Sequence, residues 1–86
     1  MPQTVTIAGN EYPGHCILTD TRLFVYLDSM SLMDGYAVVS PPHALDSITE
    51  KSYGRETTYT GYTEISAISG EYGNCNIVLK KGESNA

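Results

Sequence analysis

Two histidines and two cysteines are the residues of this sequence best suited to binding a metal ion or to nucleophilic chemistry: His15, Cys16, His43 and Cys75. Thiolate and imidazole are the usual ligands of zinc, but structural zinc sites are built from closely spaced pairs such as C-x-x-C, which the chain lacks. His15 and Cys16 are adjacent, so on a strand they would point to opposite faces. We therefore expect no metal and no cofactor.

The simpler interpretation of these four residues is structural. Cysteines far apart in the sequence of a cytoplasmic protein are more often buried thiols than a disulfide, although a bridge between Cys16 and Cys75 stays an alternative. We expect both cysteines to be small core residues and both histidines to lie on loops.

Catalysis by the acidic residues would need more than their presence. An acid–base pair can be imagined from Asp20, Asp28, Asp34 or Glu56, or a nucleophile from a Cys–His pair, but each would need a third orienting group and a pocket that excludes water. The sequence has no G-x-S-x-G, G-x-G-x-x-G or P-loop motif. A chain of 86 residues also has little room for a preorganised site. We expect that the protein is not an enzyme.

Charge and hydropathy argue against two classes of partner, nucleic acids and membranes. The net charge is −5, with five basic residues that form no stripe, which argues against binding to a nucleic-acid backbone. No apolar run approaches the ~20 residues of a membrane-spanning helix, and residues 1–10 do not resemble a secretion signal. We therefore expect a soluble cytoplasmic protein with no membrane partner.

Tyrosine dominates the aromatic residues, with seven tyrosines, one phenylalanine and no tryptophan. Tyrosine offers a rigid contact surface with a polar tip, so the stretch TTYTGYTEISAIS makes Tyr59 and Tyr62 candidate binding residues. Arg55 and Glu56, beside Gly54, are candidates because binding residues concentrate at loops and edges. Threonine and tyrosine are also good strand formers, so an ordinary hairpin explains the same composition. Two copies could pair through this edge as a homodimer.

The hydrophobic pattern predicts one α+β domain over residues 1–82, with residues 83–86 frayed. Residues 22–27 alternate most clearly, and we expect this strand to be covered on both faces. Ser31 followed by Asp34 predicts a helix start, and the prolines after Ser40 predict its end near Val39. Further strand signals occur at 4–8, at 48–53 (weakly), at 56–62 (an edge strand), at 64–69 with Ile65 and Ile68 on opposite faces, and at 75–81. Another strand either starts after Gly14 or carries an edge irregularity at Pro13 and Gly14. We expect a mostly antiparallel sheet of five to six strands with one short helix packed on one face.

The segments YTGYTEISAIS and CNIVLKK, in the last third of the chain, resemble the C-terminal part of small β-rich proteins encoded by phages and prophages. The resemblance implies a bacterial host cytoplasm and a non-enzymatic binding protein that acts stoichiometrically. Such a protein would inhibit a host defence factor or sequester its small-molecule ligand. The alternative role is a virion or tail component that assembles through exposed strand edges.

Overall fold

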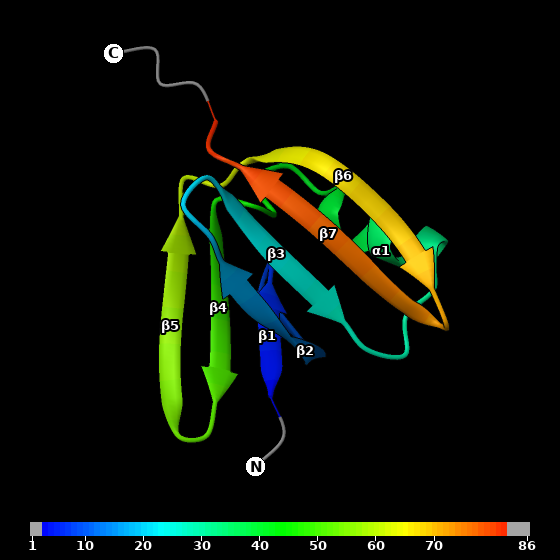
Figure 1. Ribbon diagram of the computed structural model, residues 1–86, viewed down its shortest axis with the longest axis horizontal. Helices are drawn as coiled ribbons and strands as arrows, with labels where there is room; N and C mark the ends of the chain where they lie inside the picture. Colours follow the sequence, from blue (N-terminus) through cyan, green and yellow to red (C-terminus); the bar gives the residue numbers. More distant parts are fainter. Residues whose placement is uncertain (1–2, 83–86) are drawn as a thin grey trace.

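The computed structural model describes residues 3–82, which form seven strands and one helix (Figure 1). The elements are β1 (Thr4–Ile7), β2 (Asn10–Leu18), β3 (Arg22–Leu27), α1 (Leu32–Val39), β4 (Ser47–Ser52), β5 (Arg55–Thr60), β6 (Glu64–Glu71) and β7 (Asn74–Lys80). All neighbouring strands are antiparallel, in the order β5-β4-β1-β2-β3-β7-β6. The antiparallel sheet with one short helix is as predicted, but five to six strands was too few. The weakly alternating segment 48–53 forms a full strand because it pairs on both sides, with β1 and β5.

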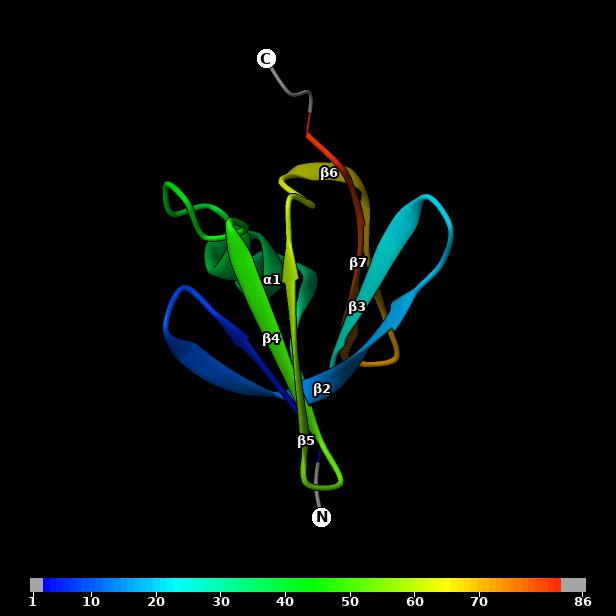
Figure 2. The same cartoon turned by 90° about the vertical axis from the view of Figure 1, so that its left-hand side faces the viewer.

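Strand β2 joins the two halves of the sheet. Its first part, through Pro13, pairs with β1, and its second part, from Gly14, pairs with β3. Figure 2 shows β2 passing from one half to the other. We expected the strand either to start after Gly14 or to carry an irregularity at Pro13 and Gly14, and the second alternative holds. At the change of partner, the Pro13 carbonyl accepts the Asp28 N–H and the Gly14 N–H donates to the Gln3 carbonyl.

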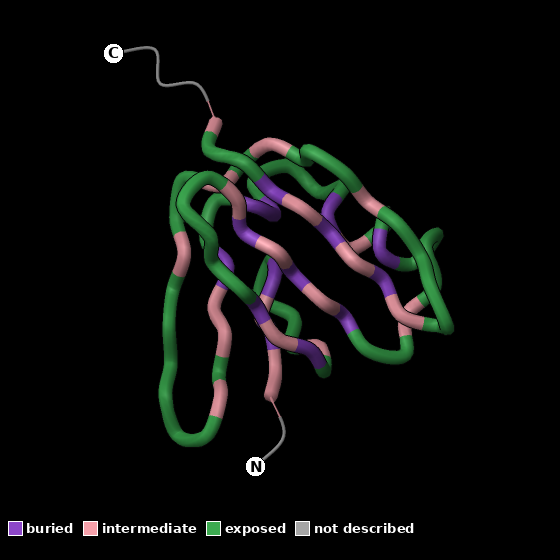
Figure 3. Tube along the Cα trace, in the orientation of Figure 1, coloured by how far each residue is buried: buried purple, intermediate pink, exposed green. Residues whose placement is uncertain are grey.

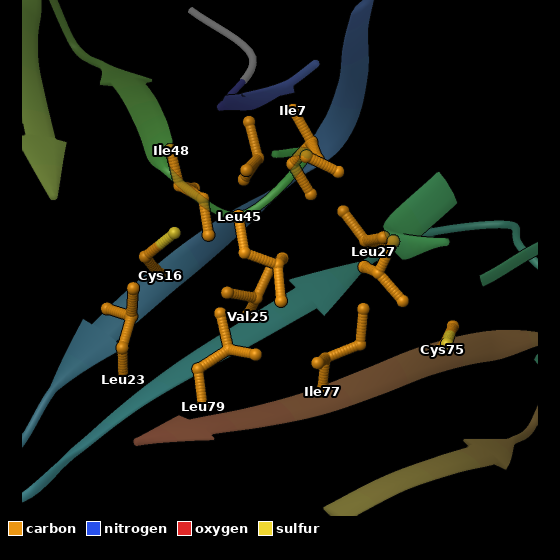
Figure 4. Packing of buried hydrophobic residues seen from close by; sticks show 13 residues of the cluster. Ile7, Cys16, Leu23, Val25, Leu27, Leu45, Ile48, Cys75, Ile77 and Leu79 are labelled. Carbon is orange, nitrogen blue, oxygen red and sulfur yellow. The ribbon is translucent and has the colours of Figure 1, made fainter. Parts of the chain in front are cut away.

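The core lies between the two halves and beneath the helix. Buried and half-buried residues alternate along β3 and β7 (Figure 3), as period-two strands require. Figure 4 shows how their side chains meet those of β1, β2 and β4. The buried hydrophobic residues that form this core are Val5, Ile7, Cys16, Leu23, Val25, Leu27, Val39, Ala44, Leu45, Ile48, Cys75, Ile77 and Leu79.

The cysteine prediction is confirmed, because Cys16 and Cys75 are both buried and both free. The histidine prediction is half wrong. His43 lies in the loop between α1 and β4, where its Nδ1 is 2.8 Å from Asp46 Oδ2. His15 lies on β2, where its ring stacks on Tyr26 of the neighbouring strand with centroids 4.8 Å apart.

Helix α1 begins and ends as predicted. The Ser31 hydroxyl accepts the Asp34 N–H at 3.1 Å and caps the first turn, and the helix stops at Val39 before Ser40 and Pro41. Gly35 lies where α1 meets β7, and a Cβ there would collide with the Cys75 thiol. The absence of a side chain at this position therefore lets the helix approach the sheet.

A β-bulge overturns the predicted faces of β6. Strict alternation would place Ile65 and Ile68 on opposite sides of the sheet. The register shifts between Ile65 and Ala67, so Ile65 pairs with Leu79 and Ile68 with Ile77, both of which face the core. One extra residue in the strand thus returns both isoleucines to the core side.

Strand β3 is covered on one face rather than two. Its core residues are fully enclosed, whereas Phe24 and Tyr26 on the other side remain half-exposed. The helix packs on the core side of the sheet, where Gly35 contacts Cys75, and so does not cover the face that carries Phe24 and Tyr26. The aromatic composition that suggested double coverage instead forms an open aromatic surface.

Candidate binding site at the β4–β5 hairpin

The predicted binding residues lie on or just after β5, the terminal strand of one half of the sheet. Tyr59 lies opposite the buried Ile48, so the side chains of odd-numbered β5 residues share the core-facing side. Glu56 pairs with Lys51 in register and points to the other side. The structure therefore separates Arg55 from Glu56. Both lie directly after the turn on an edge strand, which is the placement predicted for them, but as consecutive strand residues they face opposite ways.

Tyr59 and Tyr62 are half-buried rather than fully presented. Both pack against the hydrophobic core. Burial, followed by the nearby Glu50 carboxylate, raises the pKa of the Tyr59 hydroxyl above its ordinary value. The Tyr62 ring carries the Lys81 ammonium 5.6 Å from its centroid. Much of the surface of these two tyrosines therefore packs inside the protein and is not available to a ligand.

Glu50 is the charged residue of this region that the sequence pattern did not single out. Its Oε2 accepts the backbone N–H of Cys16 at 2.6 Å, across 34 residues of chain. From Gly14 on, β2 pairs with β3 along one edge, and its other edge no longer pairs with β1. The Glu50 carboxylate binds this unpaired edge in place of a neighbouring strand. The available signal was the alternation of β4, which places Glu50 on the same side as the buried Ile48.

An open hollow of about 390 Å³ lies between the ends of β4 and β5. Its lining residues are Glu50, Ser52, Tyr53, Arg55 and Thr57. The Arg55 guanidinium supplies a fork of N–H donors suited to a carboxylate or phosphate, and the hydroxyl groups and Glu50 supply acceptors. Gln3 Nε2 donates to Ser52 Oγ at 2.9 Å and so helps to hold this lining residue in place. This arrangement suits a polar ligand that carries an anionic group.

Tyr53 is the exposed aromatic residue of the hollow and occupies a strained turn position. Tyr53 and Gly54 form the two-residue turn between β4 and β5, with φ of 50° and 80°. A turn with positive φ at both positions favours asparagine, aspartate or glycine at the first, not a tyrosine. The Tyr53 side chain is nevertheless 72% exposed, so burial of the ring does not offset the destabilising effect of the strained backbone.

Within residues 3–82, no cluster of three or more histidine, cysteine or acidic side chains is arranged to hold a metal ion. The helix that the structure describes is too short to cross a bilayer. Comparison of the chain with protein-family models, with curated proteins and with solved structures finds no match. Any functional proposal therefore depends on the geometry of the hollow and of the exposed surfaces.

We expect both thiols to resist alkylation and to make the fold sensitive to alkali. Burial, and then the Glu50 carboxylate, raises the pKa of Cys16 from 9.0 to about 12, and burial raises that of Cys75. The thiolate is the reactive species, so iodoacetamide should modify Cys16 at pH 8 about three orders of magnitude more slowly than in the unfolded chain.

The same shift fixes the direction of the pH dependence. A cysteine whose folded pKa is raised contributes stability below its unfolded pKa, and that stability is lost as the pH rises toward the folded value. The free energy of unfolding should therefore fall between pH 9 and about 12, and Cys16→Ala should flatten this fall. Urea titrations across this range, with intact-mass measurement of alkylation, check both points. Rapid alkylation of the folded protein at pH 8 would contradict them.

Proposed function

We propose that this protein is a non-enzymatic binding protein that acts stoichiometrically, and that the β4–β5 hollow is its contact site. In a bacterial host cytoplasm, the role that fits the resemblance to small phage proteins is inhibition of a host defence factor or sequestration of the anionic ligand of that factor. Arg55 binds the anionic group, and Tyr53 provides the apolar contact beside it.

The observation that carries the proposal is the placement of the exposed, strained Tyr53 beside Arg55 in one hollow. An exposed tyrosine in a turn that favours asparagine costs the fold stability and gains it no burial. The Tyr72–Gly73 turn carries the same strain, so the strain supports a contact site only where a ligand-binding group lies beside the tyrosine. The tyrosine lies beside Arg55 in the same hollow, so an aromatic surface and a cation face the same space.

The test separates binding from stability. The protein, purified from bacterial cytoplasm, is examined by native mass spectrometry with and without mild activation, and a retained small molecule or protein partner identifies the ligand class. Arg55→Gln should weaken its retention by about tenfold or more, because a charge-assisted contact is lost. Tyr53→Asn should also weaken retention, while it raises the free energy of unfolding by about 0.5–1 kcal/mol.

Two matched controls are available in the chain. Tyr72 is 93% exposed and occupies the same first position of the Tyr72–Gly73 turn, with φ of 52°. Tyr72→Asn should raise stability similarly and leave retention unchanged. Glu56→Gln alters the opposite side of the strand that carries Arg55 and should also leave retention unchanged. Two results would contradict the proposal: a monomer without any bound molecule under all conditions, or a bound molecule whose retention is unchanged by both Arg55→Gln and Tyr53→Asn.

A second role is favoured by the ends of the sheet. β5 and β6 are the terminal strands of the order that residues 3–82 form, so each has one edge without a strand neighbour. Exposed edges template pairing with another chain, which is how a virion or tail component could assemble. Concentration-dependent ladders of oligomers, together with the protein in purified particles, would support this role over the binder.

A further inference from the structure

The uncovered face of β2, β3, β7 and β6 carries a continuous apolar row. The row crosses all four strands in register, because Ile17 pairs with Phe24, Phe24 with Val78, and Val78 with Ala67. Ile17 is 48% exposed, although it is a large aliphatic residue. We call this side of the four strands the outer face. In the view of Figure 1, α1 lies behind β6 and β7, so the helix leaves the outer face open.

An aromatic row lies next to the apolar one. Tyr26, one step along β3 from Phe24, stacks on His15 at 4.8 Å and lies 6.5 Å from the Phe24 ring with nearly parallel planes. These stacked rings fix the side chains in place before anything binds. A flat, ordered apolar surface that water covers is typical of an interaction surface.

Opposite charges lie at the two ends of the outer face. Arg22 and Lys80 are paired neighbours at one end, where Lys80 also lies 3.6 Å from Glu64. Asp28, directly after β3, and Glu71, at the end of β6, lie at the other end. A two-fold axis that runs across the strands, in the plane between two such faces, reverses the strand direction between copies. The basic end of one copy then lies over the acidic end of the other.

We infer that the outer face is a homodimer interface in which two copies pack sheet against sheet about this two-fold axis. Aligned packing of two sheets keeps strand directions within about 30° of each other or of their reverse. The axis keeps β3 over β3, so Arg22 of each copy faces Asp28 of the other. The arrangement leaves the β4–β5 hollow free, because that hollow belongs to the other half of the sheet.

The charges and the modest size of the outer face fit a second copy as the occupant. Four strands spaced about 4.8 Å apart, each five to eight residues long in this half, cover roughly 400 Å² per copy. The total of roughly 800 Å² lies at the low end for contacts between proteins, so the dimer should be weak and depend on concentration. Two copies of a chain with a net charge of −5 repel each other. The outer face carries charges of both signs, so two copies can meet there with opposite charges in contact.

Sedimentation velocity from micromolar to millimolar concentration tests the inference. The parent protein should form a monomer–dimer equilibrium. Ile17→Glu, which puts a carboxylate into the apolar row, should raise the dimer dissociation constant by at least about tenfold. Thr58→Glu adds the same charge on an exposed site of β5 and should leave the dimer almost unchanged. A strict monomer, or a dimer that responds to Thr58→Glu but not to Ile17→Glu, overturns the inference.

A charge reversal tests the direction of packing. Arg22→Glu and Asp28→Arg should each weaken the dimer by about fivefold or more, since each places like charges opposite one another. The double variant restores opposite charges and the original net charge, so it should regain most of the parent affinity. A double variant no tighter than the single variants overturns the inference. Far-UV circular dichroism of each variant verifies that it folds. Because the substituted residues are exposed or half-exposed, the variants should keep the parent fold.

Discussion

Gly35→Ala is expected to destabilise the fold by about 1–3 kcal/mol, although alanine is the better helix former by about 1 kcal/mol. The cause is contact rather than backbone conformation. A Cβ at this position would collide with the Cys75 thiol, and Cys75 is fully buried in β7. The helix or the strand must then move, and this disturbs packing across the core. Chemical denaturation of the variant and the parent measures the loss.

A second substitution should remove most of this effect. In a Cys75→Ala background the thiol is gone and only the Cβ of residue 75, 3.1 Å from the added Cβ, stays close, so adding Gly35→Ala should be near neutral, with helix propensity offsetting the remaining contact. Met33→Ala, at a 77% exposed site on the same helix, is the control for general effects on α1 and should change little. An equal loss from Gly35→Ala in both backgrounds would refute the contact mechanism.

Glu50→Leu is expected to cost about 2–3 kcal/mol of folding free energy, because it leaves the Cys16 N–H without its charged acceptor. Glu50→Gln should cost less, since an amide oxygen can still accept this bond. The result is read by chemical denaturation and by hydrogen exchange of the Cys16 amide, which should become fast in the leucine variant.

The control for Glu50 lies one strand away. Glu56→Leu, on an exposed site of β5 that faces the other side of the sheet, should change stability by less than about 0.5 kcal/mol. If the Cys16 amide stays equally protected in Glu50→Leu, the carboxylate is not the partner that satisfies it. The free edge of β2 would then be shielded by the surrounding packing.

Local patterns of the sequence predicted local structure well. Alternation of Leu23, Val25 and Leu27 defines β3 and its core face, and the Ser31 hydroxyl defines the start of α1. Each of these signals depends on neighbours within a few residues. The bulge after Ile65 defeated the same reasoning, because one extra residue reverses the faces of every residue that follows and leaves no compositional sign.

Nonlocal features were beyond the sequence pattern. Pro13 and Gly14 indicate an irregularity in the strand, but not that β2 changes partners there, since that depends on where β1 and β3 lie. The candidate site shows the same limit. Arg55 was selected as a candidate for its position near a turn, but Glu50 was missed because its partner, Cys16, is 34 residues away. Tyr59 and Tyr62 were chosen for their chemistry, and their half-buried state follows from the core that they border.

The change of partner along β2 has a consequence for how the chain folds. β1 must find β4, and β3 must find β7, across long intervening segments, and both pairings depend on the same nine-residue strand. Such distant pairings slow folding, because chain entropy is lost before the contacts that compensate for it are made. The α1 turn and the β4–β5 hairpin can form early and locally, whereas β2 is ordered only when both halves assemble. We therefore expect slow, all-or-none folding whose transition state contains β2.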